Sequence, residues 1–272
     1  MVVDFDPQSR RPVLISQMIE SYMKNDFSCG VLTGANVANE VAARQVCEST
    51  LACTFANEDL NERTRQIFHT PECFRVERIS DVAGAQVYGA LKNVVALGAG
   101  FIDAVNLGGN TKAALLRIGL HEMSTFANIF FSDSVQPGTI LQSCGVADLI
   151  TTCFGGRNRK CAKAFGIEKH DSAPTMKWDE EGCLKLWNKL EKEMLNGQKL
   201  QGTLACREVF ECLKARNLLD SFPLFKTIHD VSFADLPVYR VVDGIRTVGK
   251  IAESSINDSS ASPPTAFISS KL

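Results

Sequence analysis

The chain has 272 residues, of which 45% are hydrophobic and 22% charged, and these values exclude a disordered or fibrous protein. Its 29 basic and 31 acidic residues give a formal net charge of −2, so we expect no nucleic-acid partner. The ten cysteines form no C-x-x-C pair, which favours reduced thiols of an intracellular protein and no metal site. The longest apolar run, 94–102, is far shorter than the roughly 20 residues of a membrane span, so no span is expected.

The first 80 residues alternate between strand and helix patterns. Short apolar runs predict strands at 29–33, 51–55 and 73–79. A Gly34-Ala35-Asn36 turn follows the first of them, and Asn36 is placed to cap a helix that begins near Ala38.

Helical spacing dominates from Asp81 onward. Apolar stripes predict helices at 111–131, 139–153, 181–195, 203–217 and 222–232. Residues 168–181 lack periodicity and are predicted to be a polar surface insertion, and the serine-rich stretch from Glu253 predicts a flexible tail. We therefore expect a mainly α protein with three parts: a small α/β segment, a helical domain and a tail, at 1–80, 81–250 and 251–272.

Two segments are similar to phosphate-binding loops but lack a required residue. The run Gly98-Ala99-Gly100-Phe101-Ile102-Asp103 follows an apolar stretch, but Asp103 stands where a dinucleotide-binding turn needs a small residue. The run from Gly244 to Lys250 approaches a Walker loop, but Ile251 stands where a magnesium-binding Ser or Thr is needed.

Lys92 and Asn93 interrupt a long apolar stretch that runs from Val87 to Ile102. A partly desolvated ammonium at such a place is a good proton donor. The alternative is a lysine that reaches solvent from the edge of a helix, and spacing alone favours that alternative.

The segment 143–160 combines a helix pattern with a basic cluster. Asp148 and Thr152 are four residues apart, which places both on one helix face. A Gly155-Gly156 pair then precedes Arg157-Asn158-Arg159-Lys160, which we expect to form a loop that binds phosphate through Arg forks and backbone amides. The alternative is a solvated basic loop. A third polar loop, 195–202, carries Lys199 and Gln201 and is uninformative alone.

Four segments together resemble, in the same order, the motifs of eukaryotic-type NAD-dependent glycerol-3-phosphate dehydrogenases: 89–96 (GALKNVVA), 110–114 (NTKAA), 145–160 (GVADLITTCFGGRNRK) and 196–202 (NGQKLQG). The resemblance covers roughly 3–240, more weakly over the first 80 residues. It implies the C-terminal remnant of a Rossmann-type cofactor domain at 1–80, followed by an all-helical substrate domain.

The resemblance also implies an activity, reversible hydride transfer between NADH and dihydroxyacetone phosphate to give sn-glycerol 3-phosphate, a step of carbohydrate metabolism. Lys92 and Asp148 would be catalytic. The substrate would be bound by Asn93, Thr152, Arg157 and Asn158, and the NAD cofactor by Ala38, Arg157, Lys199 and Gln201. A homodimer is implied as well.

This sequence departs from the family pattern at its beginning. The family's glycine-rich dinucleotide turn and a second active-site lysine, expected just before Val3, have no counterpart here. We therefore keep an alternative, a catalytically inactive paralogue that acts as a helical binding or oligomerisation module.

The last three residues, Ser270-Lys271-Leu272, match the terminal tripeptide that the peroxisomal import receptor reads. We therefore expect the protein in the peroxisome or a related microbody, and in the cytoplasm if the match is accidental.

Overall fold

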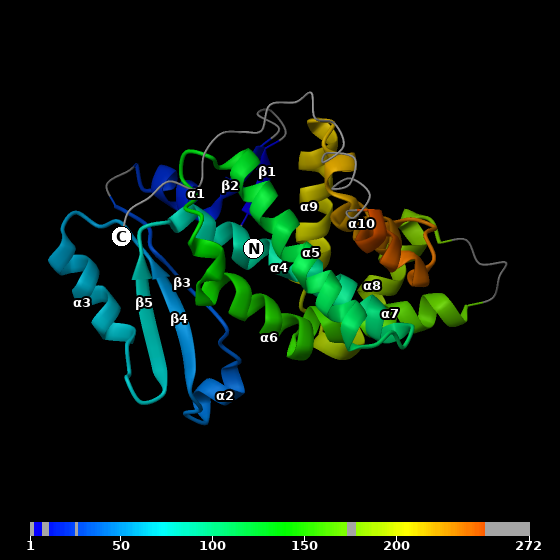
Figure 1. Ribbon diagram of the computed structural model, residues 1–272, viewed down its shortest axis with the longest axis horizontal. Coiled ribbons are helices and arrows are strands. Elements are labelled where there is room, and N and C mark those ends of the chain that lie inside the picture. The colour runs from blue at the N-terminus through cyan, green and yellow to red at the C-terminus, as the bar shows by residue number, and fades with distance from the viewer. Residues whose placement is uncertain (1–2, 7–10, 25–26, 173–177, 248–272) are drawn as a thin grey trace, which may run out of the picture.

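The computed structural model describes residues 3–6, 11–24, 27–172 and 178–247. A small sheet lies at one side of the molecule, and a larger helical body lies beside it (Figure 1), which confirms the mainly α fold expected from the sequence. The expected tail at 251–272, with Ser270, Lys271 and Leu272, lies outside the described residues. No helix among the described residues is both long and apolar enough to cross a bilayer.

The sheet has three strands in the order β3-β4-β5. β4 (Cys47–Ala52) lies in the middle, antiparallel to β3 (Val31–Thr33) and parallel to β5 (Phe74–Ile79). The short helix α2 (Ala38–Ala42) joins β3 to β4, and α3 (Glu58–Phe68) provides the crossover that a parallel pair needs. β3 and β5 lie within the strands predicted at 29–33 and 73–79, but the strand predicted at 51–55 is displaced, because β4 ends at Ala52.

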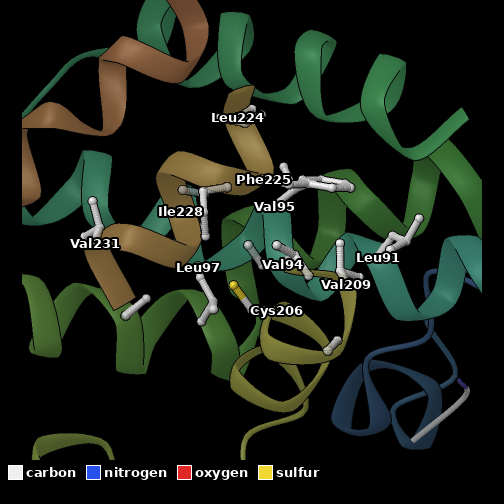
Figure 2. Packing of buried hydrophobic residues seen from close by; sticks show 14 of the residues in the cluster. Leu91, Val94, Val95, Leu97, Cys206, Val209, Leu224, Phe225, Ile228 and Val231 are labelled. Carbon is white, nitrogen blue, oxygen red and sulfur yellow. The ribbon is translucent and has the colours of Figure 1, made fainter. Parts of the chain in front are cut away.

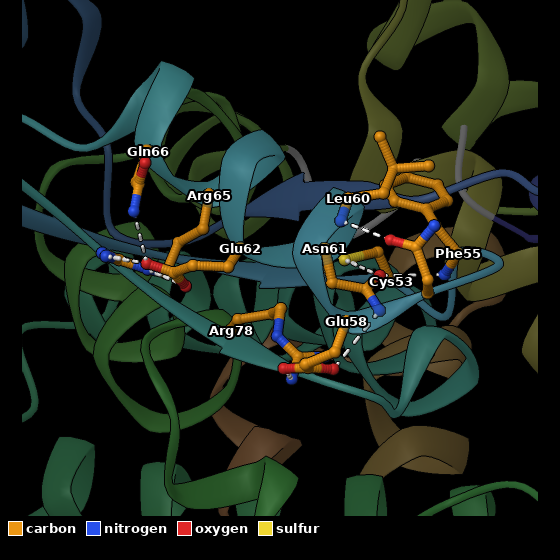
Figure 3. A network of polar contacts seen from close by, with 10 residues as sticks. Cys53, Phe55, Glu58, Leu60, Asn61, Glu62, Arg65, Gln66 and Arg78 are labelled. Carbon is orange, nitrogen blue, oxygen red and sulfur yellow. Dashed lines mark hydrogen bonds and ion pairs between the residues drawn. The ribbon is translucent and has the colours of Figure 1, made fainter.

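Polar contacts attach α3 to the sheet (Figure 3). The Asn61 side-chain oxygen accepts hydrogen bonds from the backbone N–H of Phe55, at 2.9 Å, and from the Cys53 thiol, at 3.4 Å. Arg78 of β5 forms an ion pair with Glu58 in the first turn of α3. The crossover helix is therefore tied both to the strand before it and to the strand after it.

A second, two-stranded element precedes the sheet. β1 (Val3–Asp6) and β2 (Arg11–Leu14) pair antiparallel and lead into α1 (Ile15–Tyr22). The Ser16 backbone N–H in α1 donates to the side-chain oxygen of the buried Gln86 at 3.1 Å. The Gln86 amide nitrogen in turn donates to the Ser16 hydroxyl at 2.6 Å. The hairpin is thus anchored to the helical body.

Seven α-helices form the body within the described residues: α4 (Val82–Ala104), α5 (Gly109–Phe130), α6 (Asp148–Gly155), α7 (Arg157–Asp171), α8 (Glu180–Leu195), α9 (Gln201–Ala215) and α10 (Pro223–Phe233). Three short 3₁₀ turns lie at Thr139–Leu141, Leu219–Ser221 and Val238–Arg240, and a π turn lies at Ser143–Ala147.

Helix α4 runs through the centre of the body and is buried on all sides, as expected of a helix that is apolar around its whole circumference. Its N-terminus is capped by Asp81, whose side chain accepts a hydrogen bond of 2.6 Å from the Gly84 N–H. Figure 2 shows Leu91, Val94 and Leu97 of α4 among apolar side chains of α9 and α10. All polar side chains on α4 must therefore find partners on neighbouring elements.

Two local expectations are wrong. Asn36 does not cap α2, because its side-chain amide donates to the Glu48 carbonyl at 2.9 Å and holds the turn against β4. The single helix expected at 139–153 is divided into a 3₁₀ turn, a π turn and α6, because Ser143 and Cys144 bond to the sheet instead of continuing one regular helix.

The prediction of a surface insertion at 168–181 is wrong for its first residues. Helix α7 continues to Asp171 because Lys169 is buried and donates hydrogen bonds to the carbonyls of Val231 and Ala234, at 2.8 and 2.6 Å. Trp178, at the other end, is also buried. Residues 173–177 lie outside the described residues, and the division at 81 and 251 stays a prediction.

Glu122 of α5 closes the N-terminus of α10. Its two carboxyl oxygens accept hydrogen bonds of 2.8 Å from the backbone N–H groups of Leu224 and Phe225. Burial raises the pKa of Glu122 to about 8, and the two backbone donors offset this shift only in part. The native protein therefore holds this proton more tightly than the unfolded chain does.

This pKa predicts how stability changes with pH. The contribution of Glu122 is full below its ordinary pKa of 4.5 and is lost as the pH rises to about 8. We expect the difference in free energy of unfolding between the native chain and Glu122→Gln to fall by a few kcal/mol from acid to mildly alkaline pH. Urea denaturation of both proteins across this range measures it, and a difference that does not change with pH would contradict the assignment.

Candidate functional site

Lys92 and Asp148 form an ion pair at the contact between α4 and α6. The Asp148 side chain is 5% exposed and that of Lys92 is 16% exposed, so the carboxylate is enclosed and the lysine is largely buried beside it. Burial raises the pKa of Asp148, and the Lys92 ammonium opposes this shift. Thr152, one turn along α6, donates to Asp148 Oδ1 at 3.3 Å, as the i, i+4 spacing predicts. The pair offers a proton donor whose direction is fixed.

A chain of amide contacts links α4, α7 and α9 beside this pair. Asn158 Nδ2 donates to Asn93 Oδ1 at 2.8 Å, and Asn158 Oδ1 accepts from the Gly202 N–H at 2.9 Å. Asn93 Nδ2 donates to the Gly89 carbonyl at 3.1 Å. A side chain on Gly202 would place its Cβ 2.8 Å from Asn158 Oδ1 and from the Asn93 carbonyl oxygen. The contact therefore requires glycine at 202.

The basic cluster, residues 157–160, lies on the first turn of α7, so the prediction of a loop there is wrong. Gly156 is the extended N-cap residue, and helix geometry begins at Arg157. A side chain at Gly156 would place its Cβ 2.5 Å from the Thr152 carbonyl oxygen, so the close junction between α6 and α7 requires glycine at 156. No side chain caps this N-terminus, and its first turn contains three basic residues and no acid. Cations at the positive end of a helix are unfavourable alone, but they suit an anion that bonds to the free N–H groups.

The residues expected to bind the cofactor are Arg157, Lys199, Gln201 and Ala38, and they are divided between two parts of the molecule. The Arg157 guanidinium donates to Gln198 Oε1 at 2.8 Å, and Lys199 follows directly, with Nζ 2.7 Å from Glu191 Oε2. Gln201 is the first residue of α9. Ala38, in contrast, is exposed at the start of α2, on the sheet side of the molecule.

The helical body is joined to the sheet immediately before Asp148. The Ser143 hydroxyl donates to the Glu48 carbonyl at 2.7 Å and accepts from the Ala35 N–H at 3.3 Å. The Cys144 N–H donates to the Thr50 hydroxyl at 3.2 Å. The turn after β3 and the helix that contains Asp148 are therefore held at a fixed separation.

Sequence reasoning missed three residues that support the site: Ser143, Glu191 and Gln198. Glu191 had a usable signal, because it occupies a position of the apolar stripe of α8 next to Leu190, where an acid must have a buried partner. It accepts hydrogen bonds from Lys199 and from the Leu200 N–H. Ser143 and Gln198 had no signal beyond lying in polar segments.

Two family models match separate parts of the chain. The family model described as NAD-dependent glycerol-3-phosphate dehydrogenase C-terminus matches residues 81–243. The corresponding N-terminus model matches residues 8–59.

Curated relatives carry related names. The glycerol-3-phosphate dehydrogenase [NAD(+)] of Cuphea lanceolata is 44% identical over 85% of this chain and 58% of its own length. The cytoplasmic glycerol-3-phosphate dehydrogenase [NAD(+)] of Bos taurus is 45% identical over 87% of this chain and 61% of its own length. The chain thus spans about three fifths of the length of these relatives.

Solved structures agree with the sequence comparison. Glycerol-3-phosphate dehydrogenase from Saccharomyces cerevisiae superposes with a TM-score of 0.76 at 37% identity, over 89% of this chain and 65% of its own. The structure from Dunaliella salina superposes with a TM-score of 0.77 at 40% identity, over 87% of this chain and 38% of its own.

Proposed function

The chain belongs to the family of NAD-dependent glycerol-3-phosphate dehydrogenases, and from this premise we propose that it catalyses reversible hydride transfer between NADH and dihydroxyacetone phosphate to give sn-glycerol 3-phosphate. One observation carries the proposal: the enclosed Lys92–Asp148 ion pair lies near the uncapped, basic first turn of α7. A proton donor and an anion site close together are what reduction of a phosphorylated ketone requires.

Lys92 is the general acid in this proposal. When a hydride adds to the ketone carbon, the carbonyl oxygen becomes an alkoxide, and the Lys92 ammonium donates the proton that completes the hydroxyl. Asp148 stays ionised, holds Lys92 in place and stabilises its charged form. In the reverse direction the neutral Lys92 amine takes the same proton back.

The substrate phosphate is bound by Arg157 and the free N–H groups of the first turn of α7. Arg157 has a neutral partner in Gln198, so its charge remains available to an anion. The amide groups of Asn93 and Asn158 each retain a second N–H donor for the substrate, and Thr152 orients Asp148.

The same edge of the site fits an NAD cofactor. Arg157 bonds to Gln198, and Lys199 is the next residue in the chain and pairs with Glu191. The Arg157 and Lys199 side chains are both cationic and suit the pyrophosphate of a dinucleotide. We propose that these two residues, with Gln201 and Ala38, would hold it. The bound nicotinamide would supply or accept the hydride.

Replacement of Lys92 tests the proposal. We expect Lys92→Ala to lower kcat by about 10²–10⁴-fold, the usual loss of a general acid, with a much smaller change in KM for dihydroxyacetone phosphate. Steady-state NADH oxidation measures both constants. Lys185→Ala removes a lysine from an exposed surface pair with Glu181 and should leave both unchanged.

An equal loss of kcat and of substrate affinity in Lys92→Ala would refute the general-acid role.

Fluorescence titration with NADH separates the dehydrogenase from the alternative, an inactive helical module. A folded native chain that neither binds NADH nor oxidises it would favour the inactive helical module.

We also propose that the chain forms a homodimer, as the family resemblance implies. Apolar side chains that a second copy could cover support this: Ile150 and Phe154 of α6 are 46% and 57% exposed, and Leu141 is 75% exposed. We expect Ile150→Asp to shift sedimentation toward the monomer, whereas Ile67→Asp on α3 should not. A native chain that sediments as a monomer at micromolar concentration would contradict the proposal.

We further propose that Ser270-Lys271-Leu272 directs the protein to the peroxisome wherever it forms the carboxyl terminus. A fluorescent protein fused ahead of residue 1 should then enter peroxisomes, and removal of the three residues should leave the fusion in the cytoplasm. Fluorescence microscopy with a peroxisomal marker measures this, and identical distributions of the two fusions would contradict it.

A further inference from the structure

Asp103 lies near the end of α4, eleven residues after Lys92, which is about three helical turns. The two side chains therefore share a face of the helix. Asp103 Oδ1 contacts Lys112 Nζ of α5 at 2.5 Å, and Asp103 Oδ2 contacts Arg159 Nε of α7 at 2.5 Å. Only 13% of the Asp103 side chain is exposed, so this carboxylate holds two cations largely out of water.

The contact between Asp103 and Arg159 holds the first turn of α7 against α4. Helices α4 and α7 approach so closely at Gly100 that a side chain there would place its Cβ 2.5 Å from the Ala162 Cβ. Asn158 and Arg159 are neighbours in this turn and reach α4 at two places, Asn93 and Asp103. The turn is therefore fixed at both ends of its contact with α4.

The contact between Asp103 and Arg159 also makes the cations at the start of α7 unequal in the charge that is available to an anion. Arg157, Arg159 and Lys160 all belong to the first turn of α7. Asp103 neutralises Arg159, whereas the partner of Arg157 within the described part of the chain is the uncharged amide of Gln198. Burial works against ionisation of Asp103, but the hydrogen bonds from Lys112 and Arg159 hold its pKa below the usual value, so it is charged at neutral pH.

We propose that Asp103 is a positioning residue: it withdraws Arg159 from the anion site and clamps the first turn of α7, so that Arg157 and Asn158 are presented to the substrate phosphate. This inference rests on the proposed function for the identity of the anion, but the clamp itself is a property of the turn.

Three variants and one matched control test the inference. Asp103→Asn and Arg159→Gln each break the contact with α7, and the double variant removes both partners. Lys112→Met also removes an ion pair from Asp103, but it leaves the contact between Asp103 and Arg159 intact. Two measurements are made on each protein: calorimetric titration with glycerol 3-phosphate, and backbone hydrogen exchange over residues 156–162.

We expect Asp103→Asn and Arg159→Gln to weaken glycerol 3-phosphate binding by about 10- to 100-fold, the usual cost of a small misplacement of binding groups. The double variant should be no worse than either single one, because one interaction is lost in all three. Hydrogen exchange over 156–162 should be faster in these variants. Lys112→Met should match the native chain in both measurements.

Native affinity and native exchange in Asp103→Asn would overturn the inference. So would a Lys112→Met variant with the same defects as Asp103→Asn, since a general structural role would then explain both. A native chain that does not bind glycerol 3-phosphate would contradict the proposed function, and the exchange rates over 156–162 would still decide whether Asp103 clamps the turn.

Discussion

The enclosure of α4 is the constraint on which the other elements depend. A helix buried on all sides cannot leave a polar side chain without a partner, because a lone buried polar group costs several kcal/mol at worst. Four polar side chains of α4 accordingly have partners on neighbouring elements: Gln86 on α1, Lys92 on α6, Asn93 on α7, and Asp103 on both α5 and α7. The geometry of the proposed site and the packing of the helical body are consequently parts of one arrangement.

The sheet contributes to this arrangement through Ser143 and its neighbour Cys144. Ser143 bonds to β4 and to the turn after β3, and five residues later the chain reaches Asp148. Gly34 is the complementary position, because a side chain there would place its Cβ 2.6 Å from the Ser143 hydroxyl. The part of the chain that matches the family's N-terminus model is thus linked to the proposed proton donor through very few atoms.

Periodicity and spacing predicted several elements but not their contacts. The strand β5, the long helix α5 and the shared face of Asp148 and Thr152 follow from local patterns, whereas β4 begins and ends earlier than predicted. The family motifs suggested which residues to bring together, including Lys92, for which spacing alone favoured a surface position.

Long-range partners could not be read from local patterns. In the sequence, Asp103 is notable only because it stands where a dinucleotide-binding turn needs a small residue. In the structure it binds cations on two other helices. Residues 157–160 have the composition of a loop, yet α7 begins directly after α6, at a junction that leaves no room for a side chain at Gly156. The direction of Lys169 likewise depends on carbonyls more than 60 residues away.

The uncapped start of α7 links folding to occupancy. This helix lacks the acceptor that a Ser or Asp at the N-cap would provide, and it concentrates positive charge where the helix dipole disfavours it. An anion bound there supplies the missing acceptor and neutralises the charge, so in effect it completes the helix. A ligand that binds only the native state also stabilises that state. If the substrate phosphate of the proposed function binds there, it acts as a structural component of the helix as well as a recognition group, and the folded state gains stability as substrate accumulates.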